Sequence, residues 1–343
     1  MLFIRCLALL GCLCCLSGSV SALAAPLRVT LLLEGGAGDK GWNDSLIAGL
    51  KAAEAKGLCT GKLVIAATEE EQEAAFERAA ATSDLTLVAS TAYRELLRSR
   101  AGDFPNARFG SIDEAAPAPN IMSCIFADGE VAFLAGAAAG ILARDKHVPG
   151  IRGGDELAWI SGKNSAVSQN MRNAFAMGAH SVDPALRITD KVLGTYNDPA
   201  LGHAVALQLY AAGVDIIACA AGASGLGCLR AARESGRYVF GADGNQDGLA
   251  PGQVIFSMIK RADMAVLRLV EAAATGEFRG RAVISLDLKS GGVDISDMGP
   301  LKAKLGKALP PTLERRIKEL RGELEAGRID VTTRKKGQLC DCL

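Results

Sequence analysis

The stretch LRVTLLLEGGAGDKGWND, residues Leu27–Asp44, passes from an apolar run through a glycine-rich turn into a helical pattern. An apolar run of this length followed by a helix predicts a βα unit, the building block of a parallel sheet. From Gly36 to Gly41 the turn also reads G-x-G-x-x-G, which is the spacing of a dinucleotide-binding turn. The turn is therefore a candidate binding site for a dinucleotide or for another ligand.

The same alternation of apolar runs and helical patterns continues on both sides of a glycine-rich, charged segment, Arg144–Asp155. Two successive series of about equal length predict an α/β protein with two doubly wound, parallel-sheet lobes, and this segment is the expected linker. Such folds bind ligands at the carboxyl ends of their strands, so two lobes predict a cleft. We expect strands at 27–33, 62–68, 84–90, 156–161, 186–194, 214–220 and 238–243, and helices near 42–56, 70–81, 92–99, 167–179 and 199–212.

Length and composition limit the class of protein. The chain has 343 residues, more than one hydrophobic core usually serves, which agrees with two lobes. Lys plus Arg and Asp plus Glu both number 38, so the basic footprint of a nucleic-acid-binding protein is absent. The sequence contains no G-x-S-x-G motif, and no Ser/His/Asp constellation can be assigned. We therefore expect neither an enzyme nor a cofactor.

The first residues, MLFIRCLALLGCLCCLSGSVSALAAP, indicate export. An early arginine, an apolar stretch and small residues before the cut are typical of a signal peptide, which we expect to span residues 1–24 and to be cleaved near Ala24. Lipoprotein processing before Cys12 is the alternative, but the apolar stretch Cys6–Leu10 is too short for it. We therefore favour a soluble exported protein over a lipid-anchored one.

Cysteines and histidines do not form a metal-binding pattern. The three histidines, His147, His180 and His203, lack ligand spacing to any cysteine or carboxylate cluster, so no metal is expected. Cys219 and Cys228 flank a glycine-rich turn and could approach each other, although two small buried thiols are the favoured interpretation. The pairing stays open for the six mature cysteines, Cys59, Cys124, Cys219, Cys228, Cys340 and Cys342.

Other patterns are best explained by packing. Gly136-x-x-x-Gly140 predicts a close helix contact, and Asp198 before Pro199 predicts a helix cap. A C-terminal packing helix should open at Pro310-Pro311, with one apolar face made by Leu313, Ile317, Leu320 and Leu324.

A dinucleotide fits the glycine-rich turn poorly. Asp39 would place a carboxylate at the helix N-terminus, where the pyrophosphate of a dinucleotide should sit. No acidic residue stands about 20 residues beyond Gly41, where one should bind the ribose, because position 61 is Gly. Asp39 fits better as an acceptor for hydroxyls or ring nitrogens, with Asn43 as both donor and acceptor. An oxidoreductase is therefore the less favoured alternative.

Six further motifs occur in order along the chain: DKGWN at 39–43, ADGEVAFLAGAAAG at 127–140, GTYNDPALG at 194–202, AAGASGLG at 220–227, GADGNQDGLAPG at 241–252 and SMIKRAD at 257–263. Together they resemble the basic membrane protein family, the purine-nucleoside-receptor type of substrate-binding protein for ABC importers. The resemblance covers essentially the whole mature chain. It implies a periplasmic protein, a type I periplasmic-binding-protein fold and a three-strand hinge.

The resemblance also implies a division into lobes and a set of partners. The expected first lobe comprises residues 25–147 and 253–283, the second lobe comprises 148–252 and 284–330, and a tail follows at 331–343. The expected partners are a small-molecule ligand, which the resemblance makes a nucleoside, and an inner-membrane ABC permease. We expect a monomer.

Carried over by position, the resemblance assigns roles to particular residues. Asp39 and Asn43 resemble the pair that contacts base or ribose, and Trp42 takes the place of the stacking aromatic. Asp128 matches the acidic residue before a first-lobe helix, although a helix N-cap is an alternative explanation. The predicted ligand-binding set is Asp39, Trp42, Asn43, Asp128, Tyr196, Gly222, Asp243 and Lys260.

The chemistry of this set suits a nucleoside. Trp42 and Tyr196, one in each lobe, could sandwich a flat base, and stacking on an aromatic is worth about 1–3 kcal/mol per base. Asp243 and Lys260 match the ribose-binding acid and lysine and would supply an acceptor and a donor. Gly222 would let the backbone approach the ligand.

The sequence departs from the family pattern beside the stacking position. Trp42 stands where the family usually has Phe, and Gly41 stands where it usually has Ser. A wider pocket keeps another flat heterocycle open as the ligand, such as a flavin. A surface sensor or adhesin with the same fold is a further alternative.

Overall fold

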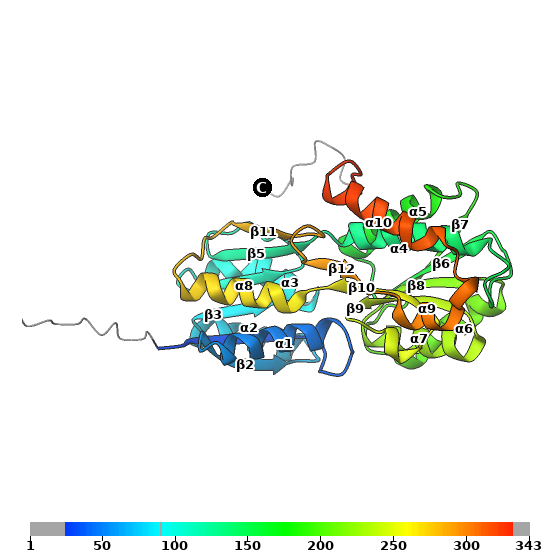
Figure 1. The fold of residues 1–343 in the computed structure, drawn as a ribbon. Helices are drawn as coiled ribbons and strands as arrows, with labels where there is room; N and C mark the ends of the chain where they lie inside the picture. The colour runs from blue at the N-terminus through cyan, green and yellow to red at the C-terminus, as the bar shows by residue number, and fades with distance from the viewer. Residues whose placement is uncertain (1–24, 90, 332–343) are drawn as a thin grey trace, which may run out of the picture.

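The computed structural model describes residues 25–89 and 91–331. These residues form two α/β lobes, each built on a six-stranded sheet (Figure 1). None of the helices described in this part of the chain is long and apolar enough to cross a membrane. The predicted signal peptide, the alternative lipidation site Cys12 and the last two cysteines, Cys340 and Cys342, lie outside the described residues.

The first sheet has the strand order β11-β5-β4-β3-β1-β2, and all its strands are parallel. Strand β1, which lies between β3 and the edge strand β2, ends in three buried leucines, because helices cover both faces. Helices α1 and α8 pack on one face, and α2 and α3 on the other. The bounds are β1 Leu27–Leu33, α1 Trp42–Ala55, β2 Cys59–Ile65, α2 Glu69–Thr82, β3 Leu85–Val88, α3 Thr91–Arg100, η1 Ala101–Asp103, β4 Phe109–Ile112, β5 Ile121–Phe126, α8 Ala262–Ala274 and β11 Val283–Leu286.

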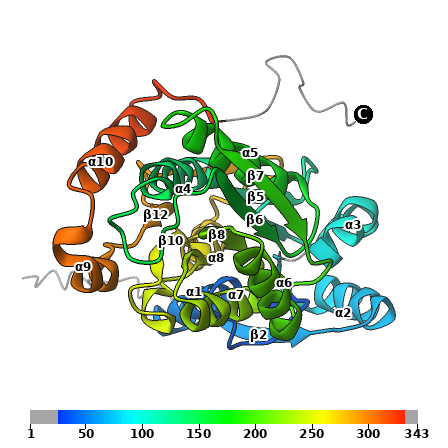
Figure 2. The same cartoon turned by 90° about the vertical axis from the view of Figure 1, so that its right-hand side faces the viewer.

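The second sheet has the order β12-β10-β9-β8-β6-β7 and is parallel except for β12, which pairs antiparallel with β10. Helices α4, α5 and α10 cover one face, and α6 and α7 cover the other (Figure 2). The bounds are α4 Asp128–Ala143, β6 Glu156–Ser161, α5 Ala166–His180, β7 Arg187–Val192, α6 Pro199–Ala211, β8 Ile216–Ala220, α7 Ala223–Ser235, β9 Tyr238–Asp243, η2 Asp247–Leu249, β10 Val254–Lys260, β12 Val293–Ile295, α9 Gly299–Leu305, η3 Gly306–Ala308 and α10 Thr312–Glu325.

The packing roles expected from the sequence are confirmed. A Cβ at Gly136 would lie 1.9 Å from the carbonyl oxygen of Phe175, so glycine is what allows α4 and α5 to touch. The carboxylate of Asp198 accepts the backbone N–H of Leu201 at 2.9 Å and caps α6. The four apolar side chains of α10 are buried: Leu313, Ile317, Leu320 and Leu324.

The chain crosses between the lobes at three places, and these differ from the expected boundaries. It crosses after β5, because α4 packs in the core of the second lobe, so residues 128–147 do not belong to the first lobe as expected. It returns between β10 and α8, which places residues 254–260 in the second sheet. It crosses again between β11 and β12, so residues 284–286 belong to the first sheet (Figure 1).

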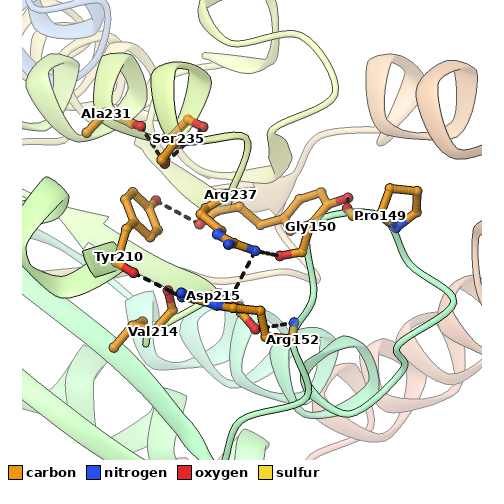
Figure 3. Close-up of polar contacts among 11 residues, drawn as sticks. Pro149, Gly150, Arg152, Tyr210, Val214, Asp215, Ala231, Ser235 and Arg237 are labelled. Carbon is orange, nitrogen blue, oxygen red and sulfur yellow. Dashed lines mark hydrogen bonds and ion pairs between the residues drawn. The ribbon is translucent and has the colours of Figure 1, made fainter. Parts of the chain in front are cut away.

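The predicted linker Arg144–Asp155 was also wrong, because this segment is fixed to the second lobe. The buried carboxylate of Asp215 accepts the backbone N–H of Arg152 at 2.6 Å and its Nε at 2.7 Å (Figure 3). Arg237 donates to the carbonyl of Gly150 at 2.5 Å and lies 3.4 Å from the same carboxylate. Two guanidinium groups around one buried carboxylate hold the segment against β8, and a mobile connection is not formed there.

Candidate functional site

A cavity lies between the two lobes at the carboxyl ends of their strands. Its volume is about 1090 Å³ when the open mouth is counted. Side chains of both lobes line it, as expected for a ligand site at the strand ends of α/β sheets. Seven of the eight predicted residues line this cavity, namely Asp39, Trp42, Asn43, Tyr196, Gly222, Asp243 and Lys260.

Trp42 forms an immobilised aromatic wall on the side of the first lobe. Its indole N–H donates to the carbonyl of Ala89 at 3.0 Å, which satisfies the one polar atom of the side chain. Phe126 packs edge-on against it, with the ring centroids 6.1 Å apart and the planes at 76°. The ammonium of Lys260 lies 4.8 Å from the centroid of the Trp42 ring. A ring fixed in this way loses little freedom when a flat ligand stacks on it.

Asp39 and Asn43 hold the glycine-rich turn together. The buried Asp39 carboxylate accepts three backbone N–H groups, from Gly41 at 3.0 Å, Asn43 at 2.8 Å and Asp44 at 3.1 Å. The side-chain amide of Asn43 donates to the carbonyl of Gly36 at 3.0 Å. The N-terminus of α1 therefore already carries a carboxylate, which leaves a pyrophosphate without the donors it needs. Contact of Asp39 and Asn43 with a ligand stays a prediction.

Lys260 is the centre of a buried charged cluster. Its ammonium bonds to the carboxylate of Asp113 and, at 2.9 Å, to that of Asp128. Burial alone lowers the pKa of Lys260, but Asp113, Asp128 and Asp243 outweigh burial and raise that pKa, so the lysine stays protonated. Burial raises the pKa of Asp128. One cation thus faces three carboxyl groups.

Asp128 does not line the cavity, and its N-cap interpretation was wrong. It is the first residue of α4, whose cap Ala127 has no side-chain bond, and the Asp128 carboxylate is directed to Lys260 instead. The Oδ1 atom of Asp128 has no hydrogen-bond partner among the described residues. Asp128 therefore binds the ammonium of Lys260 without lining the cavity itself.

Asp243 ends β9 in a left-handed backbone conformation, with φ of 65°. Asp113, which follows β4, has φ of 88°. Side chains with a Cβ adopt such angles only where their surroundings hold them, and functional sites are where this is common. Burial raises the pKa of Asp243 to about 7, with Lys260 acting in the opposite direction.

Tyr196 forms the facing wall in the second lobe, and two glycines make room for it. A Cβ at Gly162 would lie 2.1 Å from its Cδ1 atom. Gly222, with φ of +55°, is the N-cap residue before α7, and a Cβ there would lie 3.3 Å from the Cβ of Tyr196. Both glycines let the ring lie close to the backbone, so Gly222 acts on the tyrosine as well as on the cavity.

Two ionic contacts at the cavity were not predicted. Lys163, after β6 in the second lobe, lies 2.5 Å from the carboxylate of Glu34, after β1 in the first lobe. Arg94 pairs with Glu114 at 2.6 Å in the wall of the first lobe. The first pair joins the two lobes, and so does the bond of 3.3 Å from the Gln246 amide to a backbone carbonyl of the glycine-rich turn. Two contacts therefore bridge the lobes across the cleft.

Sequence reasoning also missed Asp113 and Gly162. Glu34 and Asp113 directly follow the strands β1 and β4. Lys163 follows β6 with one residue, Gly162, between them. Because the carboxyl ends of parallel strands meet at the cavity, the polar residues after each strand are the signal that could have found them.

Two α/β lobes, three chain crossings and a cavity between the lobes define the type I periplasmic-binding-protein fold. A solved solute-binding protein of an ABC transporter from Aeropyrum pernix K1 superposes with a TM-score of 0.82 at 22% identity, covering 91% of this chain and 95% of that one. The family model of the PnrA-like ABC transporter substrate-binding proteins matches residues 27–326. The chain belongs to this family.

Relatives of known name agree with this assignment. Basic membrane protein A1 of Borrelia garinii subsp. bavariensis is 25% identical over 332 residues, which cover 94% of this chain and 92% of the relative. Basic membrane protein D of Borreliella burgdorferi is 31% identical over 54% of this chain and 53% of its own length. The ABC transporter nucleoside-binding protein BmpA of Lactococcus lactis subsp. cremoris is 28% identical over 51% of this chain and 52% of its own length. The last two matches thus span about half of each relative.

Membership of this family implies a small-molecule ligand, a permease as partner and an extracytoplasmic location. Among the described residues no cluster of three or more His, Cys, Asp or Glu side chains could hold a metal ion.

Proposed function

We propose that the protein binds a purine nucleoside in the cavity between the lobes and, once exported to the periplasm, delivers it as a monomer to an inner-membrane ABC permease. The observation that carries this proposal is the combination of a fixed aromatic wall, Trp42, with the charged cluster around Lys260. A nucleoside has two parts that match these features: a flat base that can stack on an aromatic ring and a ribose diol that can bond to charged groups. The nucleoside-binding relative from Lactococcus lactis supports the choice of ligand.

Each part of the ligand has a matching part of the cavity. The base would lie between Trp42 and Tyr196, which line opposite lobes. The ribose hydroxyls would donate to the Asp243 carboxylate and accept from Lys260. Because three carboxyl groups face a single ammonium, an added phosphate would be repelled. The cavity thus favours a nucleoside over a nucleotide.

Calorimetric titration tests this function. Guanosine, inosine and adenosine are titrated in parallel with ribose, free hypoxanthine, riboflavin and guanosine 5′-monophosphate. We expect binding of at least one nucleoside and much weaker binding of guanosine 5′-monophosphate, hypoxanthine and ribose. Strong binding of riboflavin and no binding of any nucleoside would contradict the proposed ligand and indicate a flavin instead. A protein that binds none of these compounds would favour a sensor or adhesin.

The Glu34–Lys163 pair should contribute to closure by a small amount. Lys163→Met should weaken nucleoside binding by up to about fivefold, because a partly exposed ion pair is worth about 0.2–1 kcal/mol. Titration at low and high salt is the measurement, since salt should weaken binding to the native protein more than to the variant. Arg187→Met is the matched control, because its partner Asp155, at 2.9 Å, lies in the same lobe. If salt weakened nucleoside binding equally in the native protein and in Lys163→Met, the Glu34–Lys163 pair would not contribute to closure of the lobes.

A further inference from the structure

Two buried cysteines meet beside the cavity. Cys219 lies in β8, Cys228 lies in α7, and their sulfur atoms are 3.0 Å apart. Their side chains are 3% and 0% exposed. A disulfide bond is about 2.05 Å long, so the two sulfurs need to approach by only about 1 Å to be joined. The sequence left this pairing open, and the fold brings the two thiols together.

The sulfur atoms of Cys219 and Cys228 are in contact with each other. Besides Cys219, the Cys228 sulfur contacts the carbonyl of Gly202 at 3.5 Å. The other described cysteines, Cys59 and Cys124, are buried in the core of the first lobe. The residues described around the pair offer no third ligand that would make it a metal site.

We propose that Cys219 and Cys228 form a disulfide when the folding chain meets a disulfide oxidant, either a protein disulfide or a small one. One thiolate attacks the oxidant and forms a mixed disulfide with release of one thiol. The second thiolate then attacks the cysteine sulfur of that mixed disulfide and releases the second thiol. The two cysteines are oxidised by two electrons in all, the oxidant is reduced by two, and their protons go to the released thiolates. The inference rests on the proposed export, because such oxidants act outside the cytoplasm.

The bond would fasten one wall of the cavity. The loop that it closes contains Ala220, Gly222 and Ala223, which line the cavity next to Tyr196. The same loop begins α7. A crosslink here restricts the unfolded chain and fixes the turn on which Tyr196 rests. Reductant should therefore lower the melting temperature of the oxidised protein and leave that of Cys219→Ala/Cys228→Ala unchanged.

Peptide mapping tests the bond. The mature chain is unfolded, reduced, refolded with oxidised glutathione, and then unfolded again in iodoacetamide before digestion with trypsin. Trypsin releases residues 192–230 as one peptide that carries both cysteines. We expect this peptide without alkyl groups and lighter by two hydrogen atoms than the reduced form. Cys59 and Cys124 should be alkylated in the same sample, and Cys219 should become alkylated in Cys228→Ala.

Alkylation of both cysteines, or a glutathione adduct that persists on either one, in a refolded protein with native circular dichroism would overturn the proposal. Nucleoside titration of the same sample is independent of the thiol result. A missing bond and a wrong ligand are therefore distinguished.

Discussion

Replacing Lys260 with methionine should lower the free energy of unfolding by about 3–5 kcal/mol at pH 8, because it leaves buried carboxylates without their cation. Lys260 is 6% exposed, and its ammonium bonds to Asp113 and Asp128. Methionine keeps the apolar stem, so the loss reports the charge and not a cavity. Nucleoside binding should be lost as well. Urea unfolding measures the first effect and calorimetry the second.

The pH dependence identifies the cause of this loss. Without the lysine, the carboxyl groups should have pKa values in the folded protein above those of the unfolded chain, so their cost is absent at low pH and grows as the pH rises. The difference between native protein and Lys260→Met should therefore shrink toward pH 4. Lys56→Met is the control, since Lys56 pairs with Glu271 at the surface at 2.9 Å and its loss should cost less than about 1 kcal/mol. Equal stability of native protein and Lys260→Met at pH 8 would contradict the buried cluster.

Replacing Asp243 with asparagine should weaken nucleoside binding by about 10- to 150-fold, because hydrogen bonds to charged groups contribute about 1.5–3 kcal/mol. Asparagine tolerates the left-handed backbone at this position, so the fold should be kept. Stability at pH 8 should be equal or higher. The pKa of Asp243 in the folded protein is about 7, above its ordinary value, so ionisation opposes folding as the pH rises from about 4 to 7. Asparagine removes that opposition.

The same group predicts how affinity depends on pH. Below pH 7 the Asp243 carboxyl takes up a proton and loses an acceptor for the ribose diol. Affinity of the native protein should therefore fall from pH 8 to pH 5, while that of Asp243→Asn should change little. Calorimetry at four pH values with one nucleoside is sufficient. Equal affinity of Asp243→Asn and the native protein at pH 8 would contradict the assignment of Asp243 to the ribose site.

Sequence periodicity predicted the strands β1, β2, β3, β6, β7, β8 and β9, but it did not predict the crossings between the lobes. The runs at β1 and β8 are bounded by turns and helical patterns, so the βα alternation was visible. Helix α4 is buried almost all round, so its sequence has no polar face to show which sheet it covers. Composition then favoured the glycine-rich segment after it as the linker. Asp215 fixes that segment through a contact 63 residues away, which no local pattern reveals.

The site was predictable where a residue stands in one of the ordered motifs that resemble the family. Asp243 and Lys260 were assigned by that resemblance, and both line the cavity. Asp113 was missed because its strand, Phe109–Ile112, has four residues and no helical pattern follows it closely. The three backbone bonds of the Asp39 carboxylate could not be foreseen either, since they depend on how the turn folds back on its own N–H groups.

Binding of a purine nucleoside in the cavity between the lobes is tested most directly by identifying the molecule that the protein retains. Protein purified without added ligand is unfolded, and the released small molecules are separated and identified by mass spectrometry. We expect a purine nucleoside from the native protein and none from Asp243→Asn purified in the same way. A flavin or another heterocycle in the released fraction, or an empty protein that also gives no heat with nucleosides, would contradict it.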